Sequence, residues 1–154
     1  MMRPGIRAAT KRRWLAGLGA ASLVLAASGC EAPAHAAVVK CSGSVVVADI
    51  DDDVKKDCTL TIAKFDRQTS AGIRIDTGRR LAFVKGHFTV QRGTVRISLH
   101  GSTGTAAEVV VRPDGPGDVE ALLRLNRRNN GFHLRFEPDG EAAGLDGTLS
   151  YEAR

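Results

Sequence analysis

The chain has few of the side chains on which sugar binding and catalysis commonly depend. Aromatic residues make up only 5% of its 154 residues, and its single tryptophan, Trp14, lies near the N-terminus. Sugar-binding surfaces rely on exposed aromatic rings, which supply a large and rigid apolar area. The sequence instead alternates polar residues with Phe88, Phe132 and Phe136, so we expect these rings to face the core. The composition therefore disfavours an aromatic carbohydrate-binding platform.

Common catalytic motifs are missing as well. The sequence contains no G-x-S-x-G, S-x-x-K or H-E-x-x-H pattern, so it gives no sign of the corresponding serine nucleophiles or zinc centre. The only three cysteines are explained below without catalysis. We expect a protein that is not an enzyme and that carries no cofactor.

The N-terminal apolar segment is too short to span a membrane. It covers residues 14–27, contains Gly17 and Gly19, and follows five basic residues. A membrane-spanning helix needs about 20 apolar residues. A positive region followed by a short apolar one is typical of a cleavable export signal, which we assign to residues 1–29.

The end of this signal, "LAASGC" at residues 25–30, resembles the lipobox of bacterial lipoproteins, although Ala27 stands where Leu or Val is usual. The resemblance is confined to the signal. It implies that the Cys30 thiol carries diacylglycerol and that the chain is cut just before it. The competing interpretation is cleavage after "AHA", residues 34–36, which fits the A-x-A rule and would release a soluble secreted protein. Arg12-Arg13 faintly resembles a twin-arginine export motif, but paired arginines are common in any such signal.

The odd number of cysteines supports export. Unpaired thiols are a liability in an oxidising compartment, so one lipid acceptor and a disulfide between Cys41 and Cys58 account for all three. In the chain-entropy model a loop of this size contributes about 3 kcal/mol of stability.

Removal of the signal also removes the excess positive charge. The formal net charge of +5 comes from 22 basic and 17 acidic residues, and five of the basic ones precede Cys30. The remainder has 22 − 5 = 17 basic against 17 acidic residues. Nucleic-acid binding depends on a basic surplus that releases counterions, so we expect no nucleic-acid partner.

The rest of the chain has the pattern of a single β domain. Residues 30–39 form a predicted tether and residues 40–154 the domain. Apolar residues alternate with polar ones in residues 94–100 and 131–137, as in antiparallel strands with one exposed face. Similar runs occur at 44–50, 58–65, 72–76, 80–84, 86–91, 106–112, 119–126 and 145–152. The fold class is therefore all-β, either an antiparallel β-sandwich or a small closed β-barrel of about 8–10 short strands.

Two dipeptides predict hairpins. A two-residue loop at Arg92-Gly93 would set Val90 opposite Val95, and one at Asn130-Gly131 would set Leu125 opposite Phe136. The "PDG" segments at 113–115 and 138–140 predict further breaks between strands.

The predicted hairpin at Arg92-Gly93 suggests one weak metal site. It makes His87 and His100 diagonal neighbours on a polar face, about 7 Å apart at Cβ. Two ligands are too few for a tight site, and Lys85 beside them would repel a cation. Surface histidines are the preferred interpretation.

A second weak metal candidate lies between Cys41 and Cys58. Asp49, Asp51 and Asp53 could supply oxygen ligands to Ca²⁺, but Val54 and Leu60 stand where an EF-hand loop needs Gly and Glu. We expect a solvated turn there and no bound metal.

These observations predict a lipid-anchored extracytoplasmic lipoprotein of the bacterial envelope. We expect a non-catalytic binding module that is attached to the membrane through Cys30 and contacts another envelope or external protein through a sheet face or an edge strand. One alternative is a carrier that holds a small apolar ligand inside a β-barrel. A secreted envelope hydrolase is a less favoured alternative.

Overall fold

The computed structural model describes residues 36–42 and 55–154, and these form seven strands. The described residues contain no helix, and therefore none long and apolar enough to cross a membrane. Every strand pair is antiparallel. In chain order the strands are β1 (Val38–Ser42), β2 (Lys55–Phe65), β3 (Thr69–Arg74), β4 (Leu81–Gly101), β5 (Gly104–Val111), β6 (Gly117–Arg124) and β7 (Gly131–Ala153).

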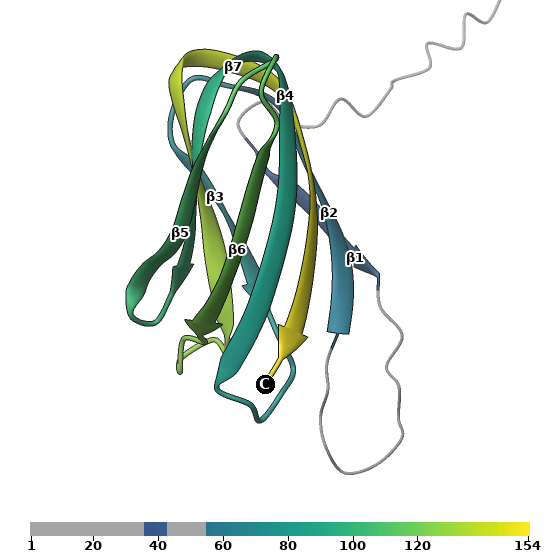
Figure 1. Cartoon of the computed structure of the whole chain (residues 1–154), viewed down its shortest axis with the longest axis vertical. Helices are drawn as coiled ribbons and strands as arrows, with labels where there is room; N and C mark the ends of the chain where they lie inside the picture. The colour runs from purple at the N-terminus through teal and green to yellow at the C-terminus, as the bar shows by residue number, and fades with distance from the viewer. Residues whose placement is uncertain (1–35, 43–54) are drawn as a thin grey trace, which may run out of the picture. The chain divides into compact units, whose positions relative to one another are not determined.

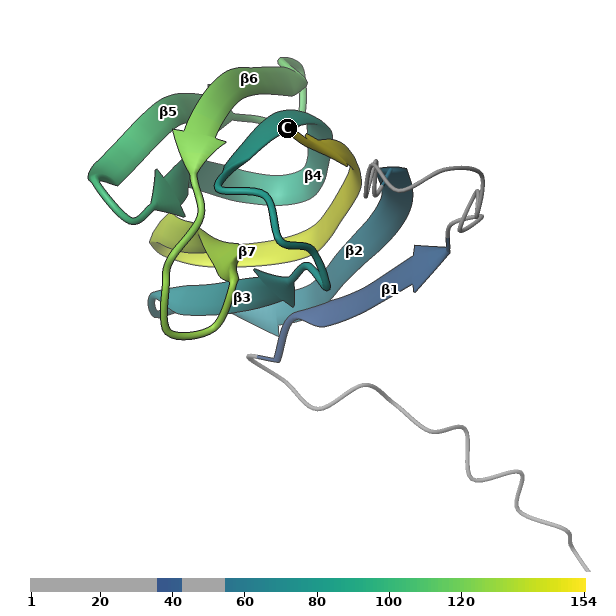
Figure 2. The same ribbon diagram turned by 90° about the horizontal axis from the view of Figure 1, so that it is seen from below.

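Two long strands, β4 and β7, pair with each other along most of their length and bend together (Figure 1). The first half of β4 and the second half of β7 lie between β6 and the β2–β1 pair. The second half of β4 and the first half of β7 lie between β5 and β3. Figure 2 shows the two halves curling over to face each other. The sheet thus folds into two layers, as in a sandwich.

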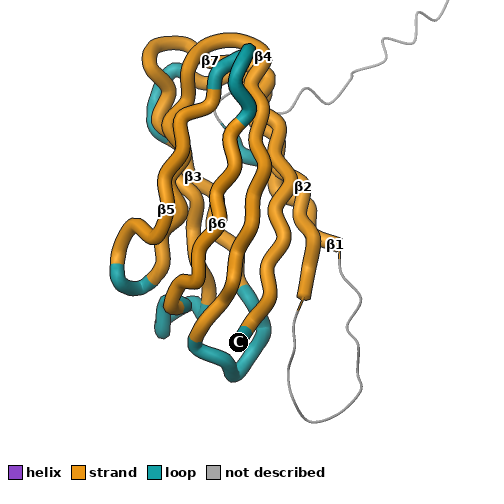
Figure 3. Tube along the Cα trace, viewed as in Figure 1, coloured by secondary structure: helices purple, strands orange, loops and turns teal. Residues whose placement is uncertain are grey.

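The all-β, antiparallel prediction is confirmed, and the structure decides between its two alternatives. The strand order is β1-β2-β7-β4-β5, with β3 added on β7 and β6 added on β4. No pairing among the described strands joins one edge to another, so the sheet is not closed into a barrel. Strand covers nearly all of this part of the chain, with short turns between the strands (Figure 3).

The hairpin predicted at Arg92-Gly93 is wrong. These residues lie inside β4, at a register shift where the strand bends from one layer into the other. Gly93 has a φ of 89°, and a Cβ there would lie 2.6 Å from the Glu141 carbonyl oxygen. Glycine at this position allows both a left-handed backbone conformation, which is a local feature, and a close approach to β7, which is not. The dipeptide does not reveal that each half of β4 pairs with β7 instead of with the other half.

The hairpin predicted at Asn130-Gly131 is wrong in a similar way. The chain does turn there, and Asn130 has a left-handed φ of 48°. However, β6 pairs with the first half of β4, whereas the start of β7 pairs with β3. Leu125 is therefore not opposite Phe136, and the turn connects the two layers instead of two neighbours in one layer.

The two "PDG" segments differ in outcome. Arg112 and Gly115 form an isolated bridge around the first segment, which separates β5 from β6 as predicted. The second segment lies within β7, which continues through its bend, with positive φ at Gly140 and Gly144. Because β4 and β7 each join several predicted runs, the described residues contain fewer and longer strands than predicted.

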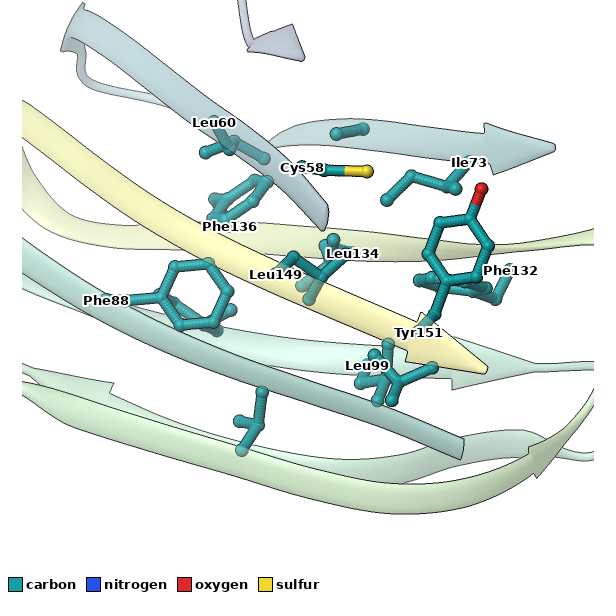
Figure 4. Close-up of a cluster of buried hydrophobic side chains, with 14 of the residues drawn as sticks. Cys58, Leu60, Ile73, Phe88, Leu99, Phe132, Leu134, Phe136, Leu149 and Tyr151 are labelled. Atoms are coloured by element: carbon teal, nitrogen blue, oxygen red, sulfur yellow. The ribbon is translucent and has the colours of Figure 1, made fainter. Parts of the chain in front are cut away.

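The predicted buried faces are correct. The side chains of Val95, Ile97 and Leu99 are buried between the layers, and so are those of Phe132, Leu134 and Phe136. Figure 4 shows several of these side chains meeting in the core. The rings of Phe88 and Phe136 contact edge to face at 6.4 Å between centroids.

The predicted disulfide between Cys41 and Cys58 is present. The two residues are directly opposite each other in the β1–β2 pair, with Cys58 buried and Cys41 exposed. The bond fastens the short edge strand β1 to the layer at the point where both strands approach residues 43–54.

Candidate functional site

The outer face of the five-stranded layer carries the main candidate site. Alternate side chains of β1, β2, β7, β4 and β6 point away from the core there. The strand register places Thr59, Thr148, His87 and Asp118 in one row across β2, β7, β4 and β6. The adjacent row contains Asp57, Ser150, Lys85 and Glu120.

Differences in side-chain length hollow out this face. The small Thr148 and Ser150 of β7 lie in the middle, and the longer Lys85 and His87 of β4 stand beside them. The resulting trough has a volume of about 610 Å³. A second hollow of about 520 Å³ continues from it toward Val38 and shares Thr59, His87 and Thr148. We call these two hollows together the β7 groove.

A salt bridge and a histidine–carboxylate hydrogen bond form one wall of the β7 groove. His87 Nδ1 lies 2.7 Å from Asp118 Oδ1, and Lys85 Nζ lies 3.3 Å from Glu120 Oε2. A carboxylate only accepts hydrogen bonds, so Nδ1 of His87 carries the proton that it donates to Asp118. All four side chains are exposed, so the pairs add little to stability. Their effect is to arrange donors and acceptors along the groove.

The His87–Asp118 pair resembles two members of a catalytic triad, but it does not reach a third. Thr148 is the cross-strand neighbour of His87. Among the described residues, no hydroxyl group hydrogen-bonds to His87. A nucleophile is activated through a hydrogen bond to its base, and within the described residues the side-chain hydrogen bond of His87 is to Asp118.

The predicted neighbourhood of His87 and His100 is wrong. His87 lies on the outer face of one layer, where it pairs with Asp118, and His100 lies in the part of β4 that belongs to the other layer. Lys85 is paired with Glu120, and the cross-strand partner of His100 on β7 is His133. The error follows directly from the bend in β4, which replaces the predicted hairpin.

His100 instead stacks on His133 of β7. The two rings are nearly parallel, with 4.9 Å between their centroids. His100 Nε2 lies 2.9 Å from Ser98 Oγ, and His100 Nδ1 lies 3.3 Å from Thr105 Oγ1. Burial lowers the pKa of His133, and the nearby His100 and Arg135 lower it further. Sequence reasoning missed this pair because only the register between β4 and β7 brings the two histidines together.

Metal ligands are not gathered within the described residues. No group of three or more His, Cys, Asp or Glu side chains there is arranged to hold an ion. The predicted lipid acceptor Cys30 and the predicted Ca²⁺ candidates Asp49, Asp51 and Asp53 lie outside the described residues. The predictions for these four positions remain predictions.

Comparisons with known proteins add little. No protein-family model and no curated protein matches the chain. One similar solved structure is a Bacillus endospore appendage from a family of disulfide-linked pili, at 14% identity and a TM-score of 0.40, covering 72% of this chain and 98% of that one. Another is the C-terminal CBM6 of LamC from Zobellia galactanivorans, at 8% identity and a TM-score of 0.31, covering 77% of this chain and all of that one.

Proposed function

We propose that this protein is a lipid-anchored, extracytoplasmic binding module without catalytic activity. Diacylglycerol on Cys30 attaches it to a bacterial membrane, and the β7 groove binds a polar segment of another envelope or external protein. The lipobox-like "LAASGC" supports the anchor. The disulfide between Cys41 and Cys58 supports an oxidising compartment.

The observation that carries the binding proposal is the β7 groove itself. Its two hollows adjoin along the outer face, so a ligand can contact several strands at once. Hydroxyl groups of Thr59 and Thr148 lie within it, and the Lys85–Glu120 and His87–Asp118 pairs form its wall. Such a surface offers many directional polar contacts, which specify a partner more than they raise its affinity.

The carrier alternative receives less support. A carrier would hold its apolar ligand in the interior of a barrel, but the sheet is not closed. The space between the layers contains fully buried Phe65, Phe88, Phe132 and Phe136 side chains. We therefore propose the outer groove, and not the interior, as the ligand-binding region.

Site-specific photo-crosslinking tests the binding proposal. A photoreactive amino acid at Thr148, in the groove, should give one protein adduct of defined mass in intact envelopes. The same amino acid at Val110, which is 42% exposed on β5 in the other layer, is the matched control and should not give that adduct.

A blocking variant distinguishes groove binding from chance contact. Ser150→Arg fills the trough beside Thr148, so the Thr148 adduct should be lost while the protein stays folded and membrane-bound. An adduct that forms equally from Val110, or that persists in the Ser150→Arg variant, would show that the groove is not the binding surface.

A further inference from the structure

An apolar patch interrupts the polar outer face near the start of β4 and the end of β6, two strand ends that can be followed in Figure 1. It consists of Leu81 and Phe83 of β4 and Leu122 of β6. Leu122 is 54% exposed and Leu81 is 37% exposed, the largest values for big apolar side chains in β4 and β6. Phe83 is the cross-strand partner of Leu122 and is partly covered by Lys85 and Arg154, each about 5 Å from its ring centre.

Arginines flank the apolar patch. Its acidic cross-strand neighbour on β7, Glu152, is paired with Lys55 and Arg154. Residues 74–81 and 122–130 contain six arginines, no lysine and one acidic residue, Asp76. Arg124 is the cross-strand partner of Leu81, and the backbone of Arg154 hydrogen-bonds to Leu81 on its other side. The Arg80 carbonyl accepts a hydrogen bond from Leu125 N at 2.8 Å, which brings the two arginine-bearing segments together.

Ion pairs with the described residues leave much of this positive charge without a counter-charge. Arg80, Arg124 and Arg127 are exposed, and no carboxylate of the described residues forms an ion pair with them. Beside them, Arg74, Arg127 and Arg128 line a hollow of about 520 Å³ together with Asp76. Uncompensated arginines are well suited to oxyanions, because the planar guanidinium group can bind phosphate through two parallel hydrogen bonds.

The segments that carry these arginines are held in place. The Asn130 side chain donates hydrogen bonds to the carbonyl oxygens of Ile75, at 2.9 Å, and Thr77. The backbone N–H of Ile75 donates to the Asn130 carbonyl oxygen at 2.9 Å. The β3–β4 connection and the β6–β7 turn are therefore joined, which lowers the entropy cost of presenting several charges to one ligand.

We propose that this end of the domain docks on the surface of a bilayer that contains anionic phospholipids. Leu81 and Leu122 enter the headgroup region, while the flanking arginines bind lipid phosphates. Exposed apolar side chains within a basic rim match a membrane surface, which has an apolar interior below negative headgroups. A soluble polyanion would use the arginines but would leave the apolar patch unexplained. The docking surface belongs to the folded domain and does not depend on a lipid at Cys30.

The test uses residues 31–154, which lack both the signal and the lipid-acceptor cysteine. Glu31–Arg154 forms one compact unit, and all described strand pairs lie within it. Sedimentation with vesicles of phosphatidylcholine containing about one third phosphatidylglycerol should capture this chain, with weaker capture as salt is raised. Vesicles of phosphatidylcholine alone should not capture it.

Charge variants locate the docking surface. Replacement of Arg80, Arg124 and Arg127 by Gln should weaken binding to anionic vesicles by about 100-fold, because each cation near such a surface contributes about fivefold. The matched control replaces Arg67, Arg92 and Arg112 by Gln. These arginines lie at the other end of the strands, so the same loss of net charge should change binding only slightly.

Apolar variants identify the partner as a bilayer. Leu81→Gln combined with Leu122→Gln should weaken vesicle binding by about 10-fold or more, whereas the control Val110→Gln should not. Circular dichroism checks that each variant is folded. If the double variant does not fold, vesicle binding is measured with Leu122→Gln alone.

Three results would overturn the proposal. The first is no capture by anionic vesicles, and the second is equal weakening by the two arginine triples. The third is an unchanged affinity of the leucine variants for vesicles while soluble polyphosphate displaces the protein. That last result would identify a soluble polyanion as the partner.

Discussion

The two stacked histidines show how neighbours alter the chemistry of a single residue. His133 is partly buried on the first half of β7, with His100 stacked on it and Arg135 two residues further along the same strand. Burial and both positive neighbours disfavour the charged imidazole, so the pKa of His133 lies below its usual value. Protonation of His133 therefore occurs more readily in the unfolded chain than in the folded one.

This difference predicts a pH dependence of stability. Full stability is expected above the unfolded-state pKa of about 6.5, and part of it should be lost as the pH falls from there toward the lower pKa of folded His133. Melting temperatures at pH 7.5 and 5.5 should differ less in His133→Gln than in the wild type. His100→Gln removes one of the positive neighbours, so it should also reduce the difference. Equal pH dependence in all three proteins would contradict the assignment.

At the scale of elements, the packing of β4 against β7 depends on positions without side chains. Gly86 of β4 and Gly147 of β7 both face the core, and the ring of Phe88 packs over both. A Cβ on Gly147 would lie 2.5 Å from Phe88 Cδ1, well inside contact distance. Phe88 is fully buried, so its ring has little room to move away.

We therefore expect Gly147→Ala to be destabilising despite the smallness of the change. Overpacking of this kind costs about 1–3 kcal/mol, which a lower urea midpoint would show. The matched control is Gly72→Ala in β3, where no atom lies within 4 Å of the added Cβ. It should leave the midpoint unchanged or raise it slightly, because Ala loses less backbone entropy than Gly. Similar midpoints for both variants would contradict the packing described here.

At the scale of elements, the sequence predicted the buried face of each strand correctly but did not predict which strands pair. The alternation that places Val90 and Val95 on the core side is a property of each strand alone, and both residues are buried. The local sequence does not determine which strand lies beside these residues. Val90 pairs with Leu145 and Val95 with Pro138, more than 40 residues away in each case. The groove and the His100–His133 stack depend on this pairing, so the sequence pattern alone could not reveal them.

At the scale of the whole molecule, charge is uneven although the total balances. The chain after residue 29 has equal numbers of basic and acidic residues, yet six arginines and one aspartate lie in residues 74–81 and 122–130. The net charge affects solubility and the long-range steering of partners, whereas binding depends on where the charges lie on the surface. A net charge near zero is thus compatible with a strongly basic docking surface.

Maturation of the whole chain gives a prediction at the molecular scale. The intact mass of protein from a membrane fraction should correspond to a chain that begins at Cys30 with added acyl groups. Reduction should add about 2 Da, because the disulfide between Cys41 and Cys58 takes up two hydrogens. A chain that begins at Ala37 without lipid would instead identify a soluble secreted protein, and the anchor would have to be abandoned.

The sequence by itself determined the all-β class, the buried face of each strand and the cysteine pair that forms the disulfide. Alternation and turn residues act over a few neighbouring positions, so they can be read without knowing the fold. Only the tertiary structure decided that Arg92-Gly93 is a bend, that His100 meets His133 and that the leucines of β4 and β6 adjoin the arginines. These relations join residues distant in the chain, and burial of the whole core selects among the many pairings that local patterns allow.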